Sequence, residues 1–164
     1  MSIMEILEWI EATQIASIAR ESLWGFQILV GLHILGLIFS VGTLAWFDLR
    51  LLGVSMRGCP LSRVYRQLMP WTLSGFLVMF VSGTFLLAGF ATAAYSNFYF
   101  RIKVVALLLA GVNAAIYHLV TERRIAQWDQ TPKPPGTARL AGLTSMFLWA
   151  VIILAGRMMS YTMF

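Results

Sequence analysis

Two histidines, His33 and His118, are the residues of this sequence best suited to bind a metal ion or a heme group. The chain has no other histidine, and each of the two lies inside a long apolar segment. Ionisable groups within a membrane are costly and are therefore functional candidates. Because a neutral imidazole can supply one axial nitrogen to heme iron, two histidines on different membrane helices predict a six-coordinate b-type heme.

Both histidines are expected to face the interior of a helical bundle. Small residues at helical spacing allow two helix backbones to approach closely in lipid. Such residues share a helix face with each histidine, namely Gly36, Ser40 and Thr43 with His33, and Ala106, Ala110 and Ala114 with His118.

The two histidines can share one iron only if they lie at the same depth in the membrane. If charged residues mark the membrane boundary, His33 lies 15 residues before Asp48 and His118 lies 4 residues before Glu122. At 1.5 Å per residue the depths then differ by about 16 Å, which excludes a shared heme.

The difference in depth is smaller if tryptophans, which are common at membrane surfaces, mark the membrane boundary instead. His33 lies 13 residues before Trp46, and His118 lies 10 residues before Trp128, with Trp71 expected on the same side. The difference then falls to about 4–5 Å, which helix tilt can absorb. Three interpretations stay open: one shared heme, histidines that are hydrogen-bonded across the bundle, and separate ligands for other cofactors or for sites shared with a partner chain.

Other polar residues give weaker signals. Arg101, Lys103 and Arg157 are expected near one membrane surface, where they can meet heme propionates or lipid phosphates, or extend to the surface as arginine and lysine commonly do. The sequence has no glycine-rich phosphate loop, no Ser–His–Asp arrangement and no carboxylate pair inside an apolar segment. Nothing therefore indicates hydrolysis or phosphoryl transfer, and the pattern does not decide whether the chain is an enzyme.

The composition indicates which elements must position these residues. Hydrophobic residues make up 59% of the 164 residues and charged residues only 12%, which is too apolar for a soluble domain. We predict an all-α membrane protein in which an amphipathic surface helix (1–22) precedes a bundle of four transmembrane helices (23–164). The four predicted spans are 23–47, 71–94, 102–121 and 140–163, and all five prolines are expected to lie between spans.

The basic residues predict the orientation of the bundle. Eight of the 12 lysines and arginines lie in the segments after the first and third spans, and four lie on the opposite side. The positive-inside rule places the two basic, proline-containing loops in the cytoplasm. Both termini are then expected in the periplasm of a bacterium, with the chain in the inner membrane. The net charge of +5 indicates orientation and does not predict a nucleic-acid partner.

Several positions resemble a family of small bacterial four-helix inner-membrane proteins of unknown function. They are His33, the run Asp48-Leu49-Arg50-Leu51-Leu52-Gly53, Phe100, Lys103, Asn113 and His118. The resemblance covers nearly the whole chain after about residue 20 and implies the four-helix membrane fold, but no activity. The architecture is also similar to that of membrane anchors that bind b-type heme.

Two functions are consistent with these features. In the first, heme b bound between the first and third spans transfers electrons, to or from a quinone or within a redox complex. In the second, the chain is a non-catalytic accessory or assembly subunit of a larger membrane complex, or associates with copies of itself. In both, the lipid bilayer surrounds the protein.

Overall fold

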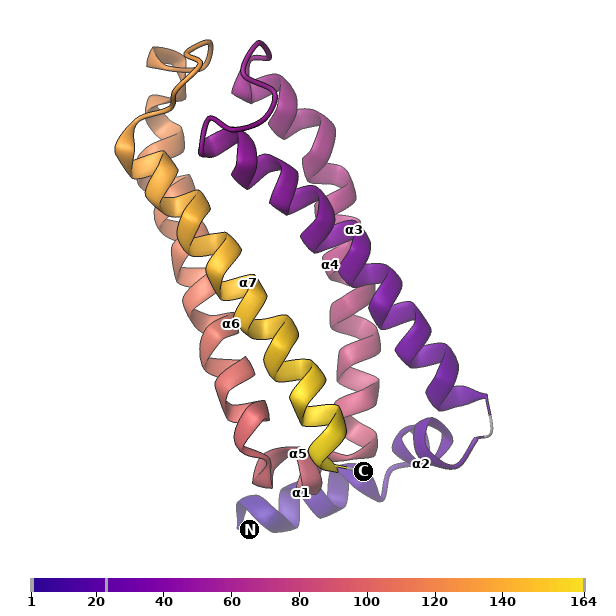
Figure 1. Ribbon diagram of the computed structural model, residues 1–164. Helices are drawn as coiled ribbons and strands as arrows, with labels where there is room; N and C mark the ends of the chain where they lie inside the picture. Colours follow the sequence, from indigo (N-terminus) through magenta and orange to yellow (C-terminus); the bar gives the residue numbers. More distant parts are fainter. Residues whose placement is uncertain (1, 23, 164) are drawn as a thin grey trace.

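The computed structural model describes residues 2–22 and 24–163, and this part of the chain is helical without any β-strand (Figure 1). The predicted all-α fold is confirmed. The elements are α1 (Ile3–Glu11), α2 (Gln14–Glu21), α3 (Gly25–Leu51), α4 (Leu61–Gly89), α5 (Ala91–Ser96), α6 (Phe98–Ile116), the π-helix η1 (Tyr117–Thr121), the 3₁₀-helix η2 (Glu122–Gln127) and α7 (Gly136–Met163).

Four segments are long and apolar enough to cross a membrane. They are α3, α4, α7 and the stretch Phe98–Thr121, which α6 and η1 form together. Each overlaps one predicted span, so the chain is a membrane protein with four candidate transmembrane helices. The predicted boundaries at Met1, Leu23 and Phe164 lie outside the described residues.

α4 is longer than predicted at its start, since it begins at Leu61 and contains Pro70. A proline within a helix lacks the N–H that would bond the preceding turn. The start of α4 is capped by Asp129 from another loop, whose carboxylate oxygens accept hydrogen bonds from the backbone N–H and the hydroxyl of Ser62, both at 2.7 Å. The prediction that every proline lies between spans is therefore wrong for Pro70.

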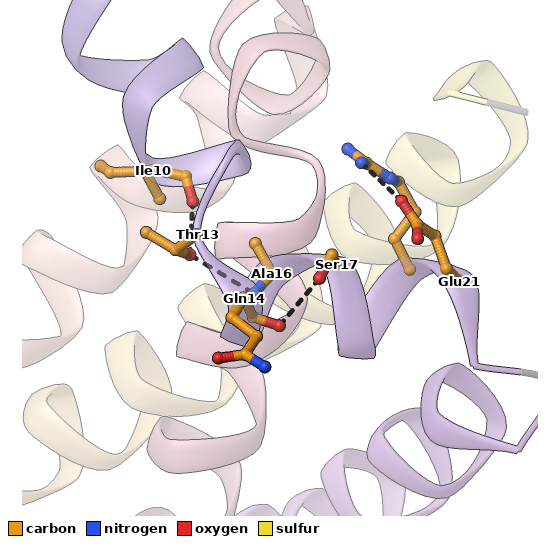
Figure 2. Close-up of polar contacts among 7 residues, drawn as sticks. Ile10, Thr13, Gln14, Ala16, Ser17 and Glu21 are labelled. Carbon is orange, nitrogen blue, oxygen red and sulfur yellow. Dashed lines mark hydrogen bonds and ion pairs between the residues drawn. The ribbon is translucent and has the colours of Figure 1, made fainter.

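The amino-terminal segment forms two short helices instead of the single surface helix predicted for residues 1–22. Thr13 separates them, because its backbone is extended and its side chain begins a new helix. The Thr13 hydroxyl donates to the carbonyl of Ile10 at 2.7 Å and accepts from the N–H of Ala16 at 3.4 Å, as Figure 2 shows. Such N-caps satisfy donors at the start of a helix.

The first of these helices is fixed to the bundle by an acidic residue. Glu11 Oε1 accepts hydrogen bonds from the backbone N–H and the hydroxyl of Thr92, both at 2.8 Å. The apolar side chain of Trp9 is 66% exposed, as expected for a helix that lies at a membrane surface. α1 and α2 thus cover the end of the bundle at which both termini lie, which we call the terminal end (Figure 1).

The long helices form two antiparallel hairpins, α3 with α4 and α6 with α7 (Figure 1). α3 and α4 approach closely where glycines face each other: a Cβ atom added to Gly36 would lie 2.8 Å from the backbone nitrogen of Met79 and 2.9 Å from the carbonyl oxygen of Gly75. The small residues predicted to allow close packing do so here. The hairpins meet mainly through α3 and α7, whereas α4 and α6 scarcely touch.

Arg50 joins the two hairpins at the other end of the bundle, which we call the loop end. Its side chain is 0% exposed. Nε donates to the carbonyl of Cys59 in the α3–α4 loop, and Nη2 donates to the carbonyl of Thr131 in the α6–α7 loop, both at 3.1 Å. Gly53 lies against Pro132 with a φ of 70°, a conformation that glycine adopts readily.

We expect Gly75→Ala to destabilise the α3–α4 hairpin by about 1–3 kcal/mol, because the added methyl group would collide with the backbone of α3. Gly42→Ala is the matched control, since a Cβ there meets nothing within 4 Å. Thermal unfolding in detergent measures both. Equal unfolding temperatures for the two variants would contradict the close contact.

We expect Arg50→Ala to lower the free energy of unfolding by about 2–4 kcal/mol, since it removes two charge-assisted hydrogen bonds from a buried site. It should also speed tryptic cleavage at Arg57 by loosening the loops. Arg63→Ala, which changes an exposed arginine at the same end, should do neither. Unchanged stability and cleavage of Arg50→Ala would show that the two loops are held by other contacts.

Candidate intramembrane ligand site

A cavity of about 880 Å³ lies between the two hairpins and is lined by all four long helices. Its wall is mainly apolar, with a few polar side chains. Leu73 and Phe80 of α4 line the cavity and are also 60% and 75% exposed, and Leu107 of α6 is 38% exposed. The cavity therefore opens sideways between α4 and α6, towards the region that lipid would occupy. A cavity of this size and lining is typical of sites for small apolar ligands and cofactors.

His33 lines this cavity and contacts α4 through its ring. Nδ1 lies 3.1 Å from Ser82 Oγ. Ser82 Oγ also lies 2.7 Å from the carbonyl oxygen of Val78. When the Ser82 proton goes to that carbonyl, Nδ1–H donates to Ser82 Oγ, and the neutral ring keeps its lone pair on Nε2.

A glycine provides the space for this imidazole. A Cβ atom added to Gly83 would lie 2.9 Å from His33 Cε1 and 3.3 Å from Nδ1. Any side chain at position 83 would therefore displace the ring. The absence of a side chain at position 83 and the hydroxyl at position 82 together set the position of the His33 ring.

Lys103 faces the same space from the opposite hairpin. It lines the main cavity, and it also lines a smaller cavity of about 220 Å³ towards the terminal end, as His33 does. A Cβ atom added to Gly156 of α7 would lie 3.5 Å from Lys103 Nζ. The two nitrogen groups are close enough to interact electrostatically. Each hairpin thus presents one nitrogen-bearing side chain to the cavity. His33 packs against Gly83 of α4, and Lys103 packs against Gly156 of α7.

The two predicted arginines differ in position. Arg157 lines the main cavity, and its guanidinium lies 4.6 Å from the ring centroid of Tyr161 and donates to the Tyr161 hydroxyl at 2.8 Å. Arg101 does not line this cavity, since its guanidinium lies over the ring of Tyr95 and donates to the Tyr95 carbonyl at 3.3 Å. The structure thus brings Arg157, but not Arg101, to the space beside His33 and Lys103.

His118 lies at the opposite end of the cavity. It belongs to the π-helix η1, and its ring centroid is 6.0 Å from that of Tyr65 and 5.3 Å from that of Tyr117. Because His33 contacts Ser82 and His118 contacts Tyr65, their levels on α4 are 17 residues apart, or about 26 Å. The two imidazoles cannot ligate one iron, so the expectation of a heme shared by His33 and His118 is wrong.

The aromatic-belt depth estimate fails for an identifiable reason. Trp46 and Trp71 are exposed, but Trp128 is only 8% exposed and packs in the core at the loop end with Phe47 and Leu61. Trp128 therefore does not mark the membrane surface. The depth estimate from charged residues, which excludes a shared heme, is closer to the structure.

Sequence reasoning gave too little weight to Lys103. The predicted third span, 102–121, contains Lys103, but the sequence placed this residue near a membrane surface and not beside His33. The helix also begins earlier than predicted, because the side-chain oxygen of Asn97 accepts from the N–H groups of Tyr99 and Phe100 at 2.9 and 3.3 Å. Asparagine is a preferred N-cap residue, so α6 begins at Phe98 and places Lys103 within the helix.

Comparisons with known proteins identify a family but no activity. Residues 6–162 match the family of unknown function DUF6644. Neither curated proteins nor solved structures give a significant match. Because the match covers nearly the whole chain, including all four long helices, the chain belongs to the DUF6644 family.

Proposed function

We propose that this chain is a b-type heme protein of the bacterial inner membrane that transfers electrons, with His33 as an axial ligand of the iron. One observation carries the proposal: Ser82 Oγ lies 3.1 Å from Nδ1 of His33, and an Nδ1–H that donates to it would leave the lone pair of Nε2 available in an apolar cavity. Histidines that ligate metals commonly donate their other N–H in this way, which fixes the tautomer and the ring orientation.

The residues around His33 suit a flat apolar group. Apolar side chains of all four long helices line the cavity, and Gly83 and Gly156 keep two parts of its wall free of side chains. When bound, heme would supply reversible one-electron exchange, while the protein supplies the ligand, the surroundings and access. Arg157 would neutralise a propionate group at the terminal end.

Lys103 is the residue that faces His33 across the cavity, and two roles are open to it. As a free amine it would be a second ligand of the iron. As an ammonium group it would pair with a propionate. These roles differ in whether arginine can replace lysine, because a guanidinium keeps the charge and does not deprotonate in proteins.

The proposed orientation follows from the basic loops. The loop end carries most of the arginines and lysines and is placed in the cytoplasm, and the terminal end is placed in the periplasm. The His33–Lys103 site then lies in the periplasmic half of the membrane. Its electron partners would be a membrane quinone or a redox subunit.

We expect the protein, expressed with ample heme and purified in detergent, to show a Soret band that His33→Ala removes and His118→Ala retains. Gly83→Ala should reduce the bound heme at least severalfold, because its methyl group displaces the His33 ring, whereas Gly31→Ala, which lies outside the cavity wall and where a Cβ meets nothing within 4 Å, should not. Absence of a Soret band from the folded wild-type protein would overturn the proposal.

Replacement of Lys103 separates its two roles. If Lys103 ligates the iron, Lys103→Arg and Lys103→Leu should both convert a low-spin spectrum to a high-spin one. If Lys103 pairs with a propionate, Lys103→Arg should keep the wild-type spectrum and heme content, and Lys103→Leu should lose heme. Leucine is used because methionine is itself a heme ligand. Wild-type spectra and heme content for both variants would show that Lys103 has neither role.

A further inference from the structure

A second group of polar side chains lines the main cavity, at the loop end. It comprises Asp48 of α3, Asn113 of α6 and Ser145 of α7. Asn113 Nδ2 donates to the carbonyl of Ala141 at 3.0 Å, one helical turn before Ser145, and the hydroxyl of Ser145 interacts with the carboxyl group of Asp48. Three helices therefore bring one carboxyl, one amide and one hydroxyl group to the same level.

The carboxyl group of Asp48 is buried without a cation. Its residue is 3% exposed, and no ion pair to it occurs among the residues that the structure describes. Arg50, two residues later, points away and donates to the two loops. A buried carboxyl group with so few partners is costly unless a ligand or a proton satisfies it.

This group is distant from the proposed heme site. Asp48 and His33 are 15 residues apart on the continuous helix α3, or about 22 Å. The cavity between them is lined mainly by apolar side chains, among them Leu44, Phe76 and Ile152. The lining therefore suits a ligand with a polar head at the loop end and an apolar body.

We infer that the loop end of the cavity binds the head group of an isoprenoid hydroquinone, with Asp48 accepting a hydrogen bond from a ligand hydroxyl group. An ionised Asp48 can only accept hydrogen bonds, so a hydroxyl group of a hydroquinone head would donate to it. A phosphate or carboxylate head is disfavoured, since the group contains an acid and no cation. The opening between α4 and α6 would admit such a ligand directly from the bilayer.

The inference goes beyond the heme proposal and does not depend on it. Asp48, Asn113 and Ser145 occupy a different part of the cavity from His33. Loss of hydroquinone binding without loss of heme would therefore identify a separate site, and loss of heme without loss of hydroquinone binding would leave the inference intact.

Decylubiquinol is the probe for the experiment. The full-length protein in dodecyl maltoside is equilibrated with the probe, separated by gel filtration, and the bound probe is extracted and quantified. We expect about one probe per chain, and an affinity about tenfold weaker for Asp48→Asn, because the amide oxygen is a weaker acceptor than a carboxylate. Glu8→Gln, an exposed acid on α1, is the matched control and should bind as the wild type does.

Two further measurements locate the probe and test the chemistry. Trp149 lines the cavity, so decylubiquinol should change the tryptophan fluorescence of the wild type and clearly less that of Trp149→Phe. Phosphatidylglycerol added in excess should not displace the hydroquinone. Equal affinity of wild type and folded Asp48→Asn, or displacement by phosphatidylglycerol, would overturn the inference, with folding checked by monodisperse elution and an unchanged unfolding temperature.

Discussion

The buried guanidinium of Arg50 is the interaction on which the arrangement of the two hairpins depends. It bonds to the carbonyls of two loops that are far apart in the sequence, Cys59 in one and Thr131 in the other. Asp129 strengthens this junction when it caps α4 through Ser62. Because these contacts lie at one end of the bundle, the hairpins can be joined firmly without a close α4–α6 contact along the membrane.

The same constraint explains why a cavity exists in so small a bundle. α3 packs tightly on α4 through Gly36 and Gly75. α6 is linked to α7 by the hydrogen bond from Asn113 Nδ2 to the carbonyl of Ala141. α3 alone packs extensively on the opposite hairpin, against α7. A fully closed four-helix bundle would bury α4 against α6, whereas here the space between these helices is left for a ligand.

The fold could be predicted well because it depends on the hydrophobicity of long runs of consecutive residues. Four apolar runs of the right length predict four spans wherever their ends lie, and the gaps between them predict the hairpins. The proposed heme site could be predicted only in part, because His33 is visible as an isolated polar residue in an apolar run. Its hydrogen-bond partner, Ser82, lies 49 positions away in the sequence.

The depth of a residue was harder to infer, since it requires a reference point on each helix. Trp128 has the residue type of a membrane-surface anchor but is buried by tertiary packing, so the depth of His118 estimated from it is wrong. Asn97 was the better marker, because an N-cap fixes the first turn of α6 through local hydrogen bonds. Arg50 resembles the other basic residues of the loops, and only the structure shows that it is buried.

The lateral opening between α4 and α6 has a consequence for how any ligand would be measured. A ligand that enters from the bilayer partitions first into the lipid, so the quantity that sets occupancy is its mole fraction in the membrane and not its concentration in water. Lipid chains themselves then act as the solvent that must leave the cavity. The acyl-chain length and fluidity of the host membrane would tune the apparent affinity without any change in the protein.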